Sequence, residues 1–130
     1  MREILLDTHV WIWASVEDRI SLSPRARRVI REAKRKWISA ISYWELAKLV
    51  ERKKIGFSMP ILGWITRSLN EMDIRIADLS PEIALESTHL KGFHKDLADQ
   101  IIVATSRVLG IPLLTSDRRI LDFPEVKTIW

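Results

Sequence analysis

Short apolar runs alternate along this sequence with longer segments whose apolar residues recur at helical spacing. The runs are typical of buried strands, and the segments between them are typical of helices that bury one face. The predicted strands cover residues 4–6, 37–41, 74–77, 111–114 and 126–129, and the predicted helices cover residues 8–15, 24–36, 42–52, 58–72, 80–91 and 96–109. Because strands separated by helices of this length usually lie parallel, the pattern predicts an α/β fold. Its central, mainly parallel sheet of four to five strands should carry helices on both faces.

The chain is long enough for one such domain and too short for two, so we predict a single domain over residues 1–130. A hydrophobic content of 47% excludes a disordered chain. No apolar run approaches the roughly 20 residues of a membrane helix, and we therefore expect a soluble, cytoplasmic protein without a membrane partner. The absence of cysteine excludes thiolate ligands and cysteine nucleophiles, so oxygen or imidazole must bind any metal ion.

Four acidic residues stand where a parallel sheet of this kind binds its ligands, beyond the carboxyl ends of the strands. Asp7 directly follows the first predicted strand, Glu45 lies four residues after the second, and Asp117 follows the fourth. Asp99 lies in the first turn of the predicted helix 96–109, which should begin at the same edge if it packs antiparallel to the strands. We therefore expect these four carboxylates to converge.

Each acid also has a local explanation. Ser42 and Glu45 form the capping-box pattern S-x-x-E, and Asp96 and Asp99 fit the cap and third position of one helix. The acid after the fourth strand fits a cap on the turn that follows it. Asp7 is harder to explain by capping alone, because it ends an apolar strand near the centre of the predicted sheet.

Converging carboxylates need a compensating charge. At ~5 Å and an effective dielectric near ~20, each pair repels by roughly 3 kcal/mol, so such a cluster holds protons or a cation. Ligands that are all hard oxygens suit Mg²⁺ or Mn²⁺, and an ion of this kind can activate a bound water as a nucleophile. Thr8, Ser42 and Thr115 supply nearby hydroxyls that could orient a water or a phosphate, or could serve only as caps.

Basic residues are concentrated in two places. Residues 19–36 hold eight lysines and arginines against Glu32 alone, a net charge of +7 in a chain whose net charge is +4. This stretch indicates either a polyanion partner or a solvated helix face. The second group follows Glu45 along its predicted helix and is the better candidate for phosphate contacts; it consists of Lys48, Arg52, Lys53 and Lys54. A carboxylate-held metal beside basic residues points to hydrolysis of phosphodiesters.

The three histidines show no spacing typical of metal ligands. His9 follows Asp7 by two residues and is expected either to pack against its neighbours or to lie near the site. His89 and His94 are expected at the surface, near a helix end and in a loop.

Four segments together resemble the PIN-domain ribonucleases, and more closely the VapC-type toxins of bacterial and archaeal toxin–antitoxin pairs. They are Leu5-Leu6-Asp7-Thr8-His9, the run 39–45, the run 94–99 and the run 112–117. Each segment alone is weak, but their order and spacing cover nearly the whole chain. Gln100 departs from the pattern, because many relatives carry arginine there, and no role is carried over to it.

The resemblance implies a PIN-like three-layer α/β/α sandwich and a metal-dependent endoribonuclease. It implies that Asp7, Glu45, Asp99 and Asp117 surround one or two Mg²⁺ or Mn²⁺ ions, with Asp96 as an auxiliary acid. A metal-activated water would cut RNA, with tRNA or rRNA as the expected target, and translation would stop. A small cognate antitoxin would bind over the site, and the toxin would form a homodimer.

Two other interpretations predict different behaviour. A non-catalytic PIN module that binds RNA or sequesters an antitoxin would carry a degenerate site, and the retained acids argue against it. A phosphotransfer receiver domain also gathers aspartates at strand ends, and Asp78 lies near the end of the third predicted strand. A receiver would also need an acidic pair after the first strand, and Asp7 has no adjacent acid.

Overall fold

The computed structural model describes residues 2–130, which contain a five-stranded sheet in the order β3-β2-β1-β4-β5 with all neighbours parallel. The strands are β1 (Glu3–Leu6), β2 (Arg35–Ser39), β3 (Ile74–Ala77), β4 (Leu113–Leu114) and β5 (Thr128–Ile129). At the centre, Leu5 of β1 pairs with Trp37 on one side and with Leu113 on the other. The predicted α/β class is confirmed, and the position of β1 places Asp7 at the middle of the carboxyl edge.

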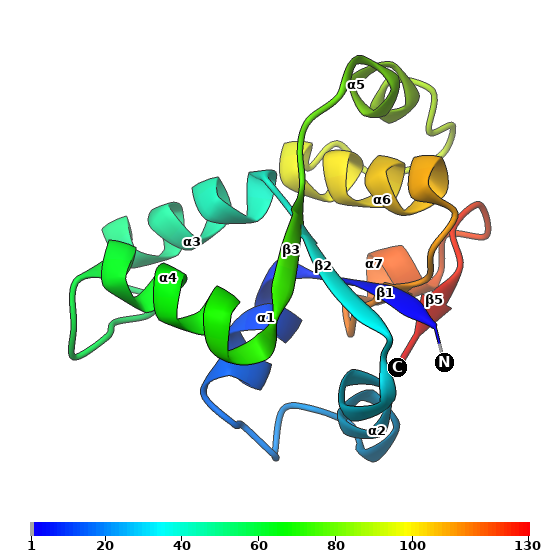
Figure 1. Ribbon diagram of the computed structural model, residues 1–130. Coiled ribbons are helices and arrows are strands. Elements are labelled where there is room, and N and C mark those ends of the chain that lie inside the picture. Colours follow the sequence, from blue (N-terminus) through cyan, green and yellow to red (C-terminus); the bar gives the residue numbers. More distant parts are fainter. Residues whose placement is uncertain (1) are drawn as a thin grey trace.

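Helices cover both faces of the sheet. They are α1 (Thr8–Ser15), α2 (Pro24–Glu32), α3 (Ile41–Glu51), α4 (Ile61–Met72), α5 (Pro81–Ser87), α6 (Leu97–Leu109) and α7 (Arg118–Leu121). Successive side chains of β1 point to opposite faces. Ile4 and Leu6 pack in one core with α1 to α4, whereas Leu5 packs in a second core with α6 and α7. Figure 1 shows α6 on one side of the strands and α1 and α2 on the other, the arrangement of a three-layer sandwich.

The limits of several helices follow from local residues. Ser23 precedes Pro24, and its hydroxyl accepts a hydrogen bond from the backbone N–H of Ala26 at 3.0 Å, so α2 begins where the sequence predicts. Gly110 has a φ of 68° and ends α6 in the left-handed conformation that glycine adopts without strain.

The predicted boundary between the second helix and the second strand was wrong. Ala33 leaves the helical conformation, so α2 ends at Glu32 and β2 begins at Arg35 rather than at residue 37. Arg35 pairs with Glu3 of β1, and Lys36 pairs with Ile74 of β3. Pairing with two neighbouring strands therefore overrides the polar character of these residues, which the hydrophobic pattern could not reveal. No helix within the described residues is long and apolar enough to cross a membrane.

Candidate metal centre

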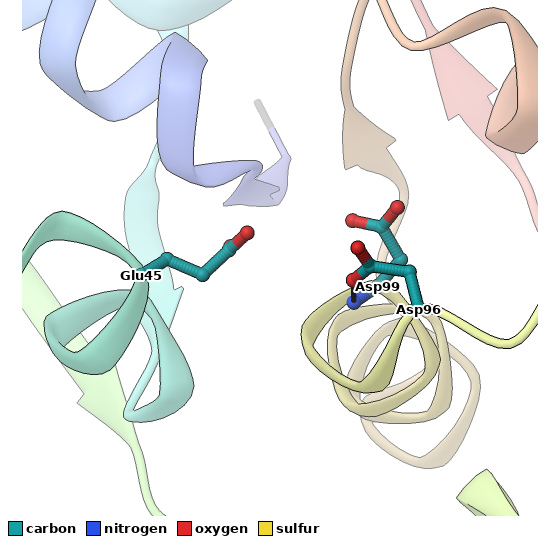
Figure 2. A group of neighbouring side chains, drawn as sticks. All are labelled: Glu45, Asp96 and Asp99. Carbon is teal, nitrogen blue, oxygen red and sulfur yellow. Dashed lines mark hydrogen bonds between the residues drawn. The ribbon is translucent and has the colours of Figure 1, made fainter. Parts of the chain in front are cut away.

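The predicted acids meet in one hollow at the carboxyl edge of the sheet. The hollow has a volume of about 340 Å³, and its lining includes Asp7, Glu45, Asp96, Asp99 and Asp117. Figure 2 shows Glu45 reaching from α3 toward Asp96 and Asp99 at the start of α6. One carboxylate oxygen from each of these three residues lies within 4.8 Å of the other two. The structure thus brings together all four acids predicted to bind metal, and it places Asp96 in the same close group as Glu45 and Asp99.

Asp7 is held rigidly at the end of β1. Its side chain is only 7% exposed, and Oδ1 accepts a hydrogen bond from the backbone N–H of Thr8 at 2.8 Å. The hydroxyl of Thr115, which follows β4, donates to Oδ2 at 2.7 Å. Burial raises the pKa of Asp7 above its ordinary value, and the hydrogen bonds from Thr115 and Thr8 only partly oppose this effect. Asp7 therefore caps α1 and faces the hollow at the same time.

Glu45 does not take part in a capping box. The helix α3 begins at Ile41, one residue earlier than predicted, and its N-cap residue Ala40 makes no side-chain cap bond. Glu45 instead accepts a hydrogen bond from the hydroxyl of Thr8 at 2.5 Å, and that hydroxyl lies 2.7 Å from the hydroxyl of Ser42. Since the proton of Thr8 goes to Glu45, Ser42 donates to Thr8. The capping interpretation of Glu45 was wrong because the helix begins too early for Ser42 to cap it.

The pKa of Glu45 is raised to about 7. Burial is the largest cause, and the negative charges of Asp7, Asp96 and Asp117 add to it, while the hydrogen bond from Thr8 opposes it. A carboxyl group in this environment binds either a proton or a cation near neutral pH.

Asp96 and Asp99 lie at the start of α6. Asp96 is the N-cap residue, and its Oδ1 accepts a hydrogen bond from the backbone N–H of Asp99 at 3.0 Å. Burial raises the pKa of Asp99 to about 8, and the charges of Asp7, Asp96 and Glu45 contribute further. The helix N-terminus is a favourable place for negative charge, but it does not offset the repulsion among these acids.

Asp117 differs from the other acids because it has a positively charged neighbour. It caps α7 by accepting from the backbone N–H of Arg119 at 2.9 Å, and the guanidinium Nη2 of Arg119 lies 3.1 Å from its Oδ2. Partial burial acts to raise the pKa of Asp117, but the hydrogen bonds and charge of Arg119 outweigh it and hold the pKa below its ordinary value. Asp117 is therefore ionised when Glu45 and Asp99 still hold protons.

Sequence reasoning missed two residues that contact the acids. Nη2 of Arg119 also lies 3.3 Å from Oδ2 of Asp99, so one guanidinium joins two acids of the hollow. His94 was expected at the surface, but its side chain is only 21% exposed, and Nε2 lies 3.2 Å from Oδ2 of Asp99. Its Nδ1 accepts from the backbone N–H of Asp96 at 3.3 Å, which leaves Nε2 as the protonated nitrogen that faces Asp99. In the sequence, only the short spacings His94–Asp96 and Asp117–Arg119 could have indicated that these two residues contact the acids.

The other two histidines lie in different surroundings. His9 lines the hollow and is exposed, with its ring 5.8 Å from the ring of Trp13. His89 is exposed, as predicted.

The predicted RNA-contacting residues lie along α3 and beyond it. Lys48 is one turn from Glu45, pairs with Glu51 at 3.1 Å and lies over the ring of Trp44. Arg52 is about 10 Å farther along the helix axis than Glu45, since each residue adds about 1.5 Å. Lys53 and Lys54 line a separate hollow with Ile55 and other residues of the α3–α4 connection. Lys48 thus lies one helical turn from Glu45 without lining the acidic hollow itself, and the remaining three lie farther along the chain.

The residues of the hollow fit a hard divalent cation. Its candidate ligands are carboxylate oxygens, and three of them converge closely enough to share one ion. Burial first, and then repulsion from the neighbouring acids, raises the pKa values of Glu45 and Asp99, and a bound cation would oppose both effects. A site with this donor set favours Mg²⁺ or Mn²⁺ over zinc or copper.

The chain matches the PIN domain family over residues 4–126, and it belongs to that family. A relative, Ribonuclease VapC22 of Mycobacterium tuberculosis (strain ATCC 25618 / H37Rv), is 35% identical over 133 residues, an alignment that covers 100% of both chains. Within the PIN-domain family, the chain is therefore of the VapC type.

Solved structures show the same fold. VapBC2 from Rickettsia felis, bound to a DNA fragment from its promoter, contains a chain with a TM-score of 0.72 and 17% identity, covering 98% of each chain. DNA-bound VapBC from Salmonella typhimurium gives a TM-score of 0.71 and 19% identity, covering 99% of this chain and 98% of that chain. At these identities the likeness concerns the fold, which confirms the predicted PIN-like architecture.

Proposed function

We propose that this protein is a metal-dependent endoribonuclease that acts as the toxin of a toxin–antitoxin pair. The observation that carries the proposal is the hollow in which acids at the end of β1, in α3 and at the starts of α6 and α7 converge. Membership of the PIN-domain family and the relative named as a ribonuclease support the same reaction.

Asp7, Glu45, Asp99 and Asp117 would hold one or two Mg²⁺ or Mn²⁺ ions, with Asp96 assisting. Such an ion, when bound, supplies an activated water for attack on an RNA phosphate. Thr115 fixes Asp7 by its hydrogen bond. Thr8 fixes Glu45 in the same way, and Ser42 holds the hydroxyl of Thr8, so these hydroxyls keep the carboxylates aimed into the hollow. Preorganised ligands of this kind avoid the cost of ordering them when the ion binds.

The basic residues beside α3 would bind the RNA backbone. Lys48 lies nearest to the acids, and Arg52, Lys53 and Lys54 extend the positive surface away from them. Contacts with phosphates give affinity without sequence selectivity. We propose tRNA or rRNA as the substrate, with inhibition of translation as the consequence of cleavage.

Related structures are described as VapBC complexes and as a toxin–antitoxin complex from Klebsiella pneumoniae. By analogy we propose that a small cognate antitoxin binds this chain and blocks the hollow. We also propose a homodimer as the toxin's assembly state, which sedimentation or light scattering of the purified protein would test.

The first experiment is cleavage of total cellular RNA by the purified protein with Mg²⁺, with Mn²⁺ and with EDTA, alongside Asp7→Asn. We expect metal-dependent cuts that leave 5′-phosphate ends, and a loss of at least 100-fold in the variant, because a buried ligand is replaced by a neutral amide. The matched control is Asp78→Asn, which makes the same change in an exposed acid directly after β3, outside the hollow. We expect this control to cleave as the wild type does.

Equal activity of Asp7→Asn and wild type would contradict the role of Asp7. RNA binding without cleavage, in a preparation free of bound antitoxin, would instead favour the alternative of a non-catalytic module. That module would lose affinity with rising salt, and its affinity would survive the Asp7→Asn substitution.

A further inference from the structure

A second basic surface lies at the opposite end of the sheet from the acidic hollow. Its hollow, of about 670 Å³, is lined by Arg2, Arg25, Arg28, Val29, Glu32 and Ala33. The lining thus contains three arginines and one glutamate. Figure 1 shows α2 near the amino ends of β1 and β2, whereas α3 begins at their carboxyl ends.

The burial of one face of α2 leaves Arg25 and Arg28 on its outer face. Ala26 is fully buried, and Val29, Ile30 and Ala33 pack against the main core, so one face of the helix is committed to the protein interior. Arg25 and Arg28 are exposed on the rest of the helix. The backbone N–H of Lys34 donates to the carbonyl of Arg2 at 2.7 Å, which ties the start of β1 to the end of α2.

The charge of this surface is not neutralised by ion pairs. Within the described residues, none of Arg2, Arg25 and Arg28 comes within ion-pair distance of an acid. By contrast, Arg67 and Arg107, which lie on other helices, each contact a glutamate. Arg31 and Lys34 are also exposed and extend the positive surface. Several guanidiniums without partners are suited to phosphates, which they bind in a bidentate manner.

We infer that this surface, Arg2 with Arg25 and Arg28, is a second docking site for the phosphate backbone of a folded RNA substrate. The inference rests on the proposed ribonuclease function. Arg2 and Asp7 are five residues apart along an extended strand, or about 17 Å, so a dinucleotide or trinucleotide bound in the acidic hollow would not reach it. A folded RNA is wide enough to contact both ends of the sheet. The surface would therefore select for large structured RNA without taking part in the chemistry.

The test compares Arg25→Gln/Arg28→Gln with the wild type on two substrates, a folded tRNA-sized RNA and a trinucleotide RNA that spans the mapped cut site. Glutamine keeps the helix propensity and removes only the charge. The control pair is Arg67→Gln/Arg75→Gln, which removes the same charge from exposed residues elsewhere. We expect KM for the folded RNA to rise about tenfold with kcat unchanged, and both constants for the short RNA to stay as in the wild type.

Binding is measured separately in an Asp7→Asn background, so that it does not depend on cleavage. Loss of two phosphate contacts should make the slope of log affinity against log salt shallower by roughly 1.4 to 1.8. The inference would be overturned if the Arg25→Gln/Arg28→Gln variant had the same KM for the folded RNA and the same salt slope as the control pair. An acidic protein would then remain as the candidate partner of this surface. Equal impairment on both substrates would also overturn it, because the acidic hollow itself would then be disturbed. If the wild type binds folded RNA without cutting any RNA, the ribonuclease proposal fails. The salt slope of the variant, compared with that of the control pair, then still shows whether Arg25 and Arg28 contact the RNA.

Discussion

Arg119 contacts two acids of the hollow at once, with Nη2 3.3 Å from Asp99 and 3.1 Å from Asp117. Its guanidinium supplies part of the positive charge that a divalent ion would supply. Because the side chain is 57% exposed, it can swing away without breaking the core. Arg119 would therefore compete with a bound ion for the same carboxylates.

We predict that Arg119→Ala binds Mn²⁺ severalfold more tightly than the wild type, because the acids lose a competing positive charge. Calorimetric titration of the metal-free protein measures this directly and needs no RNA. The neighbouring substitution Arg118→Ala is the control, since Arg118 pairs with Asp122 outside the hollow. Equal or weaker binding by Arg119→Ala would show that the arginine holds the acids in place rather than competing for them.

The raised pKa values of Glu45 and Asp99 predict how stability depends on pH in the metal-free protein. With pKa values of about 7 and about 8, both groups keep protons in the native state that the unfolded chain loses near pH 4 to 5. The native state therefore binds more protons over this range, and the free energy of unfolding falls as pH rises toward 8. Asp117, with a lowered pKa, contributes stability that is lost only in stronger acid.

We expect the melting temperature of the metal-free protein to drop by several degrees between pH 5.5 and pH 8.5. Glu45→Gln should flatten this dependence, because the amide does not ionise. Excess Mg²⁺ should reverse it, since the ion binds the ionised carboxylates and releases protons. A melting temperature that rises with pH in EDTA would contradict the shifts assigned to these two acids.

The positions of the four acids could be predicted from sequence because each lies within a few residues of a strand end or a helix start. Ile4, Leu5 and Leu6 mark a central strand, and the acid after such a strand lies at the carboxyl edge by topology alone. The contacts of His94 and Arg119 could not be predicted in this way. They depend on where α6 and α7 begin relative to the sheet, which is set by packing between distant segments.

At the scale of elements, a serine near a proline predicted the start of a helix correctly only where the serine directly precedes the proline. Ser23 accepts from the backbone of Ala26, and Ser80 does the same for Ile83. Ser58 also lies near a proline, but the N-cap residue of α4 is Pro60 and makes no side-chain cap bond. The capping box of α3 failed for a similar reason, since the helix begins before Ser42.

We predict that Ser23→Ala lowers the free energy of unfolding by about 1 kcal/mol, because α2 loses a hydrogen bond to one of its free N–H groups. Urea denaturation followed by tryptophan fluorescence measures the change. Ser58→Ala, at a position without a capping role, should leave the midpoint within error of the wild type. Equal destabilisation by both substitutions would mean that the cap of α2 contributes nothing specific.

At the scale of the whole molecule, the alternation of strands and helices was sufficient to predict the parallel sheet and its two helical layers. The ends of helices and strands were less predictable where backbone pairing between strands outweighed the polar composition of a segment. The polarity of Arg35 and Lys36 predicted that they extend the second helix. Both lie in β2 instead, because β1 and β3 offer them backbone partners. The apolar β1 indicated a central position for Asp7, whereas the complete strand order was not predicted.

The central position of β1 also decides when the acidic hollow can form as the chain is made. Leu5 pairs with Trp37 and with Leu113, so the strand translated first completes its pairing only after a segment more than a hundred residues later has emerged. Asp7 likewise meets Asp117 only at that stage. Non-local pairing of this kind delays folding until the distant segment is present. Under the proposed ribonuclease function, the set of acids stays incomplete during most of translation, so the ribosome that makes the chain would meet the finished site only near the end of synthesis.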